Sequence, residues 1–415
     1  MTTDSKSLFL GFLSLALCLG ASAQSSTFNV RDYAATGAGA QFDTAAIQKT
    51  INDCAAHGGG IVRFPAGVYL TKSIFLSNNI TLQLDDGAVI KAAPNPDDWG
   101  DPAIALIHAR GVTNVGLEGK GVVDGDGSLW WPPVLEAKRA NRPYTRRRPR
   151  LVIFSGCRNV HVRGVTLRNS PMFHLVPMDC ENVLIDNISI LAPADSPNTD
   201  AIDPSVCHHV RISHCLIDVG DDNVAIKSAH PWRGGGMGCD DIVISDCTFL
   251  HGHGVSIGSE TMGGVTNLLV ERCSFKDTIH GIRIKTSRAK GGLIDGAVYR
   301  DLSMKDVRWP INIACYYPKL PAEDSAQPIT ATTPVYRNIH FVNLTATSPD
   351  SAGFIVGLPE KFISGISLQN VTIHAPRGLT VRNTDDLKLT HVNIKTETGE
   401  PLLTNNAHVE ILIAP

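Results

Sequence analysis

Acidic and basic side chains gather in four short motifs in the middle of the chain. These motifs are NTDAID (Asn198 to Asp203), GDD (Gly220 to Asp222), GHGVSIGSE (Gly252 to Glu260) and GIRIK (Gly281 to Lys285). Carboxylates that crowd together shift one another's pKa, so one can hold a proton while another stays charged. Hydrolysis of a glycosidic bond needs both states, an acid for the leaving oxygen and a base for water. The Arg and Lys side chains would hold an anionic substrate.

Each motif also has an ordinary structural explanation. Two adjacent Asp residues are common at turns, and Arg283 and Lys285 alone would fit a solvated strand face. His253 lies between two glycines and would fit a turn. These explanations leave open why the four motifs fall in successive units of a repeat.

The repeat runs through most of the chain with a spacing of about 21 to 32 residues and one longer excursion after Tyr317. Apolar residues recur at relative positions 0, 2, 5 and 7, as in NVHVRGVTL from Asn159. Two alternations offset by an odd step predict two short strands joined by a bend. Several units add a third alternation, such as Val224 and Ile226. Three strands in a unit of this length predict an all-β, single-stranded parallel β-helix.

Two further features fit this architecture. The segment DTAAIQKTINDCAAHGGG predicts an amphipathic helix with Asp43 as its N-cap and an end at Gly58, which would cover the open end of the solenoid. Cys215, Cys247 and Cys273 share one interior position of the repeat, where a thiol behaves as a small hydrophobic group. Their spacing predicts no particular disulfide pairing.

The repeat predicts how the motifs stack. Asp222 and His253 both come two residues before an apolar pair, so we expect them to be neighbours on consecutive coils. Strict alternation with Val224 would send Asp222 inward, where an unpaired charge is costly. We therefore expect the alternation to fail just before Asn223, at a corner or bulge from which Asp221 and Asp222 both reach the outer face.

The ends and the charge of the chain define its class. Residues 1–23 predict a secretory signal peptide, with Lys6, an apolar run from Leu8 to Gly20 and the cleavage pattern Ala21-Ser22-Ala23. Residues 24–415 would then form one β-helix domain, secreted to an extracellular or periplasmic space. The net charge of −3 gives no sign of nucleic-acid binding. After the signal, no segment is long and apolar enough to predict a membrane span.

In this order, NTD, GDD, GHGVSIGS and RIK resemble the motifs of the polygalacturonases, glycoside hydrolase family 28. The segments GGGIVRFPAGVYLTKSI and NSPMFHL also resemble that family's opening coils. The resemblance implies a right-handed parallel β-helix of the pectin-lyase type. It further implies hydrolysis of α-1,4 bonds of pectin or polygalacturonate with inversion, an anionic polysaccharide as partner, and no metal or other cofactor. We expect a monomer, because the buried columns of a solenoid are satisfied within one chain.

The resemblance also assigns roles to individual residues. Asp221 matches the general acid, Asp200 and Asp222 match the pair that activates water, and His253 matches the histidine that supports the acid's protonation. The residues that it implies for substrate binding are Asn198, Arg283, Lys285 and Tyr317, with Tyr316 as an alternative to Tyr317.

Some features depart from the family pattern and leave alternatives open. Ala201 replaces the usual glycine, Glu260 is more typical of bacterial and exo-acting relatives, and a basic loop contains Arg146 to Arg148. That loop is either solvated, or binds a polyanionic chain or closes the cleft for exo action. The alternatives for the whole chain are a rhamnogalacturonan or xylogalacturonan hydrolase, a Ca²⁺-dependent pectate lyase, and a noncatalytic polysaccharide-binding β-helix.

Overall fold

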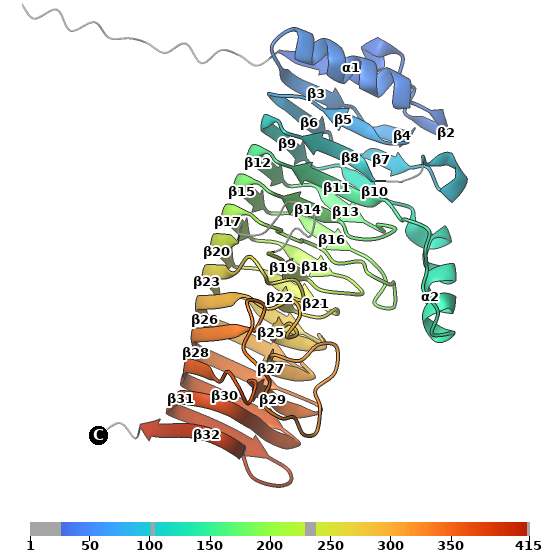
Figure 1. Ribbon diagram of the computed structural model, residues 1–415. Coiled ribbons are helices and arrows are strands. Elements are labelled where there is room, and N and C mark those ends of the chain that lie inside the picture. The colour runs from blue at the N-terminus through green and yellow to red at the C-terminus, as the bar shows by residue number, and fades with distance from the viewer. Residues whose placement is uncertain (1–25, 101–103, 229–237, 413–415) are drawn as a thin grey trace, which may run out of the picture.

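The computed structural model describes residues 26–100, 104–228 and 238–412, and shows a column of stacked coils (Figure 1). The predicted signal peptide, residues 1–23, lies outside the described residues. Helix α1 (Thr44–Ala56) covers the blue end of the column, and strand β32 (Leu402–Leu412) is the last strand at the red end. None of the described helices has the length and apolar character that crossing a membrane requires.

Three ladders of parallel strands run along the column, and the coil is right-handed, the sense favoured for parallel crossovers. The first ladder contains β1 (Thr27–Asn29), β3 (Gly60–Phe64), β6 (Ile80–Leu84), β9 (Thr113–Gly119), β12 (Arg158–Arg163), β15 (Glu181–Asp186), β17 (His208–Ser213), β20 (Cys239–Ser245), β23 (Val265–Glu271), β26 (Leu293–Lys305), β28 (Val335–Thr347), β30 (Ile363–Ala375), β31 (Arg377–Thr396) and β32. The second contains β2 (Ala38–Phe42), β4 (Gly67–Thr71), β7 (Ala88–Ala92), β10 (Val122–Asp124), β13 (Thr166–Arg168), β16 (Ser189–Leu191), β18 (Leu216–Asp218), β21 (Thr248–Leu250) and β24 (Ser274–Lys276), and continues into the long strand β26.

The third ladder carries the residues of interest. It contains β5 (Ile74–Leu76), β8 (Ala105–Arg110), β11 (Arg150–Ser155), β14 (Leu175–Met178), β19 (Val224–Ile226), β22 (Val255–Gly258), β25 (His280–Lys285), β27 (Trp309–Ala314) and β29 (Ser351–Val356), and joins β31. Between β14 and β19, isolated bridges at Ile202 and Ser205 continue the ladder. The remaining elements are α2 (Trp131–Arg139) and the short 3-10 helices η1 (Val30–Tyr33), η2 (Pro96–Asp98) and η3 (Gly127–Leu129).

The predicted bends occur at left-handed backbone positions. The residues that open the units are all at positive φ, from 52° at Asp241 to 73° at Gly296. Asn, Asp and Gly tolerate this region best, which explains their recurrence at the corner. At the first of these corners the side chains also form a ladder, in which Asn159 donates to Asn114 at 2.9 Å and Asn182 donates to Asn159 at 3.2 Å.

The interior is filled by stacked apolar columns, as predicted. Cys215, Cys247 and Cys273 are at most 2% exposed and unpaired, so they pack as small hydrophobic groups. Helix α1 buries Ile47 and Ile51 on the first coils. The prediction for Asp43 was right in position and wrong in contact, because its carboxylate caps no helix N–H and instead accepts from the backbone of Thr36 at 2.7 Å.

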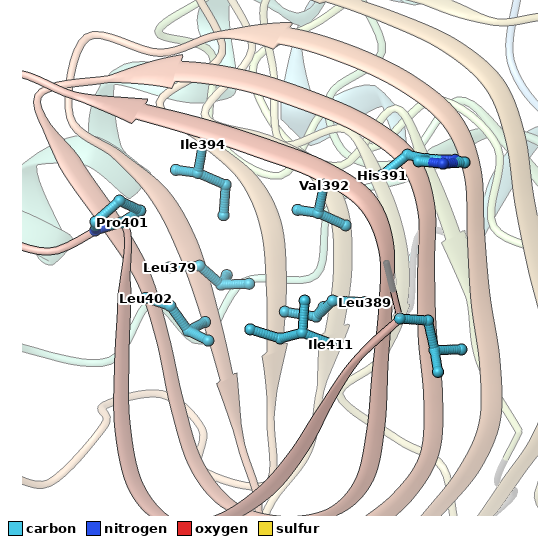
Figure 2. A pocket seen from close by; sticks show the side chains of 9 residues that line it. Leu379, Leu389, His391, Val392, Ile394, Pro401, Leu402 and Ile411 are labelled. Atoms are coloured by element: carbon cyan, nitrogen blue, oxygen red, sulfur yellow. The ribbon is translucent and has the colours of Figure 1, made fainter. Parts of the chain in front are cut away.

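The last coil leaves the interior column open at the C-terminal end. Figure 2 shows the apolar cavity at this end and the side chains that line it, including Leu379, Leu389, Ile394, Leu402 and Ile411. Ile411 on β32 is 67% exposed, so the end of the column that α1 does not cover presents apolar surface.

Candidate active site

The four motifs lie together on the outer face of the third ladder. Strand pairing aligns Ala225 with Ser256 and Ser256 with Arg283, which defines one outward column. A second outward column aligns Ser205 with Lys227 and Gly258 with Lys285. The inward residues between them, such as Val224, Ile226 and Ile282, are fully buried. Each coil therefore presents its polar side chains to the same cleft.

Two residues of these columns, Asp203 and Lys227, were missed in the sequence. Asp203 follows the inward Ile202, and Lys227 follows the inward Ile226. The same alternation that placed Arg283 and Lys285 on the outer face places both of these there as well. The signal was present in the sequence, although Asp203 is the last residue of NTDAID and Lys227 lies outside the four motifs.

The predicted failure of alternation at Asp222 is confirmed. The chain bends between β18, which ends at Asp218, and β19, which starts at Val224. Both carboxylates line the outer cleft rather than the apolar interior. Asp222 accepts a hydrogen bond at 2.8 Å from the hydroxyl of Ser256, an outward residue of the next coil.

Asp222 is buried among cations. Its Oδ2 lies 2.6 Å from Nζ of Lys285, and its Oδ1 lies 3.7 Å from a guanidinium nitrogen of Arg283. Burial alone would raise the pKa of the Asp222 carboxyl, but the charges of Lys285, Lys227 and Arg283 lower this pKa well below its usual range. The neighbouring cations therefore favour the carboxylate form of Asp222.

His253 links the two adjacent acids. Its Nδ1 lies 3.0 Å from Oδ1 of Asp221 and 3.8 Å from Oδ1 of Asp222. Gly252 and Gly254 on either side have φ of 86° and 70°, and an added Cβ would come within 2.5 Å of backbone oxygen at each. These two glycines allow the tight path that brings the imidazole onto Asp221.

Behind His253 lies a second histidine that the motifs did not include. The rings of His253 and His280 are edge-on with centroids 6.0 Å apart, and His280 stacks on Trp309 at 5.1 Å. Burial, with the nearby Arg283 charge, lowers the pKa of His280 well below its usual value. His280 is therefore a neutral imidazole, and it supports the position of His253 without adding charge.

Asp200 belongs to a second charged group, with Asp203 and Lys227. Nζ of Lys227 lies 3.8 Å from Oδ2 of Asp200 and 3.6 Å from Oδ2 of Asp203. Burial, followed by the neighbouring acids Asp203 and Asp221, raises the pKa of Asp200 well above its usual range, although Lys227 opposes the shift. Burial also raises the pKa of Asp203 to about 6. One ammonium thus lies near two carboxyl groups whose pKa values are both raised.

The predicted substrate-binding residues lie in two places. Tyr317 lies with Arg283 and Lys285, and Asn198 lies beside the basic loop. Tyr317 is 39% exposed, and its ring lies 5.7 Å from the Arg283 guanidinium and 5.5 Å from the Lys285 ammonium. Tyr316 instead donates to Asp324 at 2.7 Å and packs under Arg288, away from the cleft. Position therefore favours Tyr317 over Tyr316.

Asn198 is held by the basic loop. Its Oδ1 accepts from Arg148 at 2.7 Å, and the same guanidinium donates to the backbone oxygens of Pro171 and Pro197 at 2.8 Å each. Arg148 is only 8% exposed. Of the alternatives left open for this loop, a purely solvated loop does not hold at Arg148, which ties the loop to the segment carrying Asp200.

These residues surround one cavity of about 450 Å³. It is lined by Arg150, Met172, Phe173, Val176, Met178, Asn198, Asp200, Asp203, Ser205, Asp221, Asp222, Lys227, Ser259, Glu260, Lys285 and Tyr317. Of the eight predicted site residues, six line the cavity, and the other two, His253 and Arg283, contact Asp222. The arrangement offers a carboxylate, carboxyl groups able to carry a proton, and cations for an anionic ligand.

Asp221, Asp222 and His253 also bring three metal-ligand atoms within 4.8 Å of one another. Lys285 and Arg283 already contact the Asp222 carboxylate. Their positive charges disfavour a further cation at the same oxygens. The donor set therefore fits an ion-paired acid better than a metal ligand.

Comparison with known proteins places the chain among carbohydrate-active enzymes. The sequence model of the glycosyl hydrolases family 28 matches residues 54–396. A probable polygalacturonase of Vitis vinifera is 32% identical over 367 residues, which cover 83% of this chain and 73% of that protein. An endo-polygalacturonase of Pectobacterium carotovorum is 34% identical over 300 residues, which cover 66% of this chain and 72% of that protein.

Solved structures agree with the sequence comparison. The exopolygalacturonase of Thermotoga maritima matches with a TM-score of 0.77 and 27% identity, over 89% of this chain and 92% of that one. The polygalacturonase of Erwinia carotovora matches with a TM-score of 0.68 and 25% identity, over 98% of this chain and 100% of that one. These relatives include both exo-acting and endo-acting enzymes.

Proposed function

The chain belongs to the glycosyl hydrolases family 28, and on that premise we propose that it hydrolyses α-1,4 bonds between galacturonate units of pectin or polygalacturonate. One observation carries the proposal. Asp200, Asp221 and Asp222 line the same cavity as Lys285 and Tyr317, so acid and base groups lie beside a cation and an aromatic ring. Lys285 is paired with Asp222, but the Arg283 guanidinium beside the Tyr317 ring lies 3.7 Å from Asp222 and keeps N–H donors that a galacturonate carboxylate can accept from.

In the proposed mechanism Asp221 protonates the leaving glycosidic oxygen. His253, 3.0 Å away, orients the Asp221 carboxyl. Asp222 is held as a carboxylate by Lys285, and it accepts a proton from the attacking water, whose other side is held by Asp200. General acid and base catalysis of this kind contributes about 10² to 10⁴ in rate for each group.

We propose a single displacement with inversion. One oxygen of Asp221 and one of Asp222 lie within 4.8 Å, a gap too small for water and a sugar between that pair alone. The water therefore lies toward Asp200, on the preceding coil. Proton NMR at early times tests this course, because inversion of an α bond gives the β anomer first and retention gives the α anomer first.

The proposed substrate recognition depends on Arg283 and Tyr317. Tyr317 lines the cavity, and the Arg283 guanidinium lies 5.7 Å from the Tyr317 ring. The proposal assigns the sugar carboxylate to Arg283 and the sugar face to Tyr317. Asn198, held by Arg148, also lines the cavity and provides a further polar contact.

The function is tested by incubating the protein with polygalacturonate in the presence of EDTA. We expect reducing ends to accumulate without ultraviolet absorbance from unsaturated products. Absorbing products, or loss of activity with EDTA, would indicate a lyase and overturn the proposal. Cleavage of rhamnogalacturonan or xylogalacturonan in place of polygalacturonate would overturn the substrate. Product lengths distinguish exo action, which releases monomer, from endo action, which releases a ladder of oligomers.

We also propose that the protein is exported and that residues 1–23 are removed. The basis is the sequence of that segment alone, with Gln24 as the expected first residue. N-terminal sequencing of the protein recovered from culture medium or periplasm tests this, and a chain that retains Met1 there would contradict it.

A further inference from the structure

The loop that follows Tyr317 covers residues 318–334, between β27, which ends at Ala314, and β28, which starts at Val335. It forms no helix or strand, so no backbone ladder fixes its course. Tyr317 lines the cavity, and its hydroxyl makes no hydrogen bond with the described part of the chain. Apart from the two cations beside the ring, the position of Tyr317 therefore depends on how this loop is held.

Asp324 is the centre of the hydrogen bonds that hold the loop. Its Oδ2 accepts from the hydroxyl of Tyr316 at 2.7 Å and also from the guanidinium of Arg288. Its Oδ1 accepts from the backbone N–H of Ser325 at 2.9 Å. The Asp324 side chain is only 16% exposed, and a hydrogen bond between two charged groups is stronger than one between neutral groups. Asp324 thus links the loop to the residue directly before Tyr317.

Arg288 is itself fixed by a third coil. It follows β25 by three residues, and it donates from Nε and Nη2 to the two carboxylate oxygens of Glu360, at 2.6 Å and 3.0 Å. This hydrogen bonding lowers the pKa of Glu360, whose side chain is 5% exposed. The two-point contact leaves the guanidinium in one orientation, so Asp324 binds to a fixed partner.

Arg382 on β31 holds the backbone of the same loop. Its guanidinium donates to the carbonyl oxygen of Ala322 at 2.7 Å and to that of Pro321 at 3.1 Å. The Tyr316 ring lies 5.8 Å from the Arg382 guanidinium and 5.6 Å from that of Arg288. Contacts from three coils therefore converge on the loop and on Tyr316.

We propose that Asp324 is a positioning residue for Tyr317. By binding Tyr316 and Arg288 it ties the loop to the neighbouring coils, and the tied loop keeps the Tyr317 ring in the cleft. Tyr317 is one of the residues that line the cavity and Asp324 is not, so Asp324 acts through Tyr317 rather than on the substrate. The proposal rests on the proposed function, in which the Tyr317 ring packs against a sugar.

The kinetics of Asp324→Ala test this role. The variant leaves Arg288 paired with Glu360, so it creates no unpaired buried charge. We expect KM for polygalacturonate to rise about tenfold and kcat to change by less than about twofold, because a displaced ring weakens the binding of substrate and transition state alike. Asp324→Asn should retain part of the effect of the parent residue, since an amide oxygen still accepts from Tyr316. An unchanged KM in Asp324→Ala would overturn the proposal.

The matched control is Asp295→Ala. Asp295 also joins two coils, accepting from Arg337 at 2.8 Å and from Asn338 at 2.7 Å, but it lies on the first ladder and outside the cavity. This variant should keep the parental KM. Equal melting temperatures of Asp324→Ala and Asp295→Ala exclude general loss of stability as the cause of a raised KM.

A double-mutant cycle shows whether Asp324 acts through Tyr317. In a Tyr317→Ala background the positioned ring is absent, so Asp324→Ala should change KM by less than about twofold. A rise in KM as large as that seen with Tyr317 present would show that Asp324 acts on another part of the site, and would overturn the proposal.

Proteolysis separates this inference from the function it rests on. Lys319 is exposed and is the only Lys or Arg in residues 318–334, so trypsin reports on this loop at one bond. Asp324→Ala should be cut after Lys319 at least about tenfold faster than the parent, because a charge-assisted pair that closes the loop is lost. Equal rates would overturn the role of Asp324 even if the enzyme cleaves pectin. Faster cutting of the variant, in a protein that cleaves no galacturonan, would uphold the hold on the loop and contradict the proposed function.

Discussion

Nζ of Lys285 lies 2.6 Å from Oδ2 of Asp222, two coils away along the β-helix. The Lys285 side chain is 9% exposed and the Asp222 side chain 2% exposed, so the pair is shielded from water. The family resemblance implied that Lys285 binds the substrate carboxylate. Lys285 pairs with Asp222 in this structure, and the proposed function therefore assigns the sugar to Arg283, whose side chain is 15% exposed, and to Tyr317.

Removing this ammonium should impair chemistry more than binding. In Lys285→Met, burial is no longer opposed by the largest cationic contribution, so the pKa of Asp222 rises and its carboxylate is lost at higher pH than in the parent. We expect kcat to fall by about a hundredfold and the low-pH limb of the pH–rate profile to move upward. Lys285→Arg should restore part of the activity.

The matched control is Lys290→Met. Lys290 pairs with Glu260 at 3.0 Å, but its side chain is 50% exposed and does not contact Asp222. A Lys285→Met enzyme with normal kcat and a raised KM would show that Lys285 serves the substrate directly.

Lys227 and Asp203 should shift the pH profile in opposite directions. Lys227 lowers the pKa of Asp200, and Asp203 raises it. If Asp200 acts unprotonated, Lys227→Met should move the low-pH limb of kcat/KM upward. Asp203→Asn should move it downward by up to about one pH unit. If the profiles of both variants on polygalacturonate shift in the same direction, Lys227 and Asp203 do not act in opposite directions on the pKa of Asp200.

His253 should matter far more than a histidine two residues away. His253 contacts Asp221 at 3.0 Å inside the cleft, and His251 contacts Asp218 at 2.8 Å with half its side chain exposed. We expect His253→Gln to lower kcat by about tenfold to a hundredfold, because Asp221 loses the partner that orients it. His251→Gln should keep parental kcat. Similar losses in both would assign the His253 effect to general disruption of the bend.

The thiols should be inert in the native protein. All nine cysteines of the described chain are buried and unpaired, and burial raises the pKa of Cys239 to about 12. A thiol reagent should therefore react with none of them in the native state and with all nine after denaturation. A reductant should leave the melting temperature unchanged. Fewer than nine reactive thiols in denaturant would reveal a disulfide.

Local patterning was sufficient to predict the coil but not every contact of the site. The alternation of Val224 and Ile226 and the left-handed corners at residues such as Asn159 follow from short-range sterics, so periodicity located them. The same alternation at Asp203 and Lys227 was overlooked. That alternation predicts that both side chains face outward, because the residue before each of them is apolar and faces inward.

Other contacts join residues that no local pattern relates. Arg148 reaches Asn198 across 50 positions, and Lys285 reaches Asp222 across 63. The choice between Tyr316 and Tyr317 depended on Asp324, eight residues beyond Tyr316, in a loop without a repeat. Long side chains that cross coils depend on rotamers and on neighbouring charges, which the repeat does not encode.

The most direct test is the activity of Asp221→Asn on polygalacturonate, measured as reducing ends at saturating substrate. Asparagine keeps the size of the side chain but cannot protonate the leaving oxygen. We predict a loss of about 10² to 10⁴ in kcat with the melting temperature and substrate binding retained. An Asp221→Asn enzyme that folds and stays nearly as active as the parent would contradict the assignment of the acid, and with it the proposed mechanism.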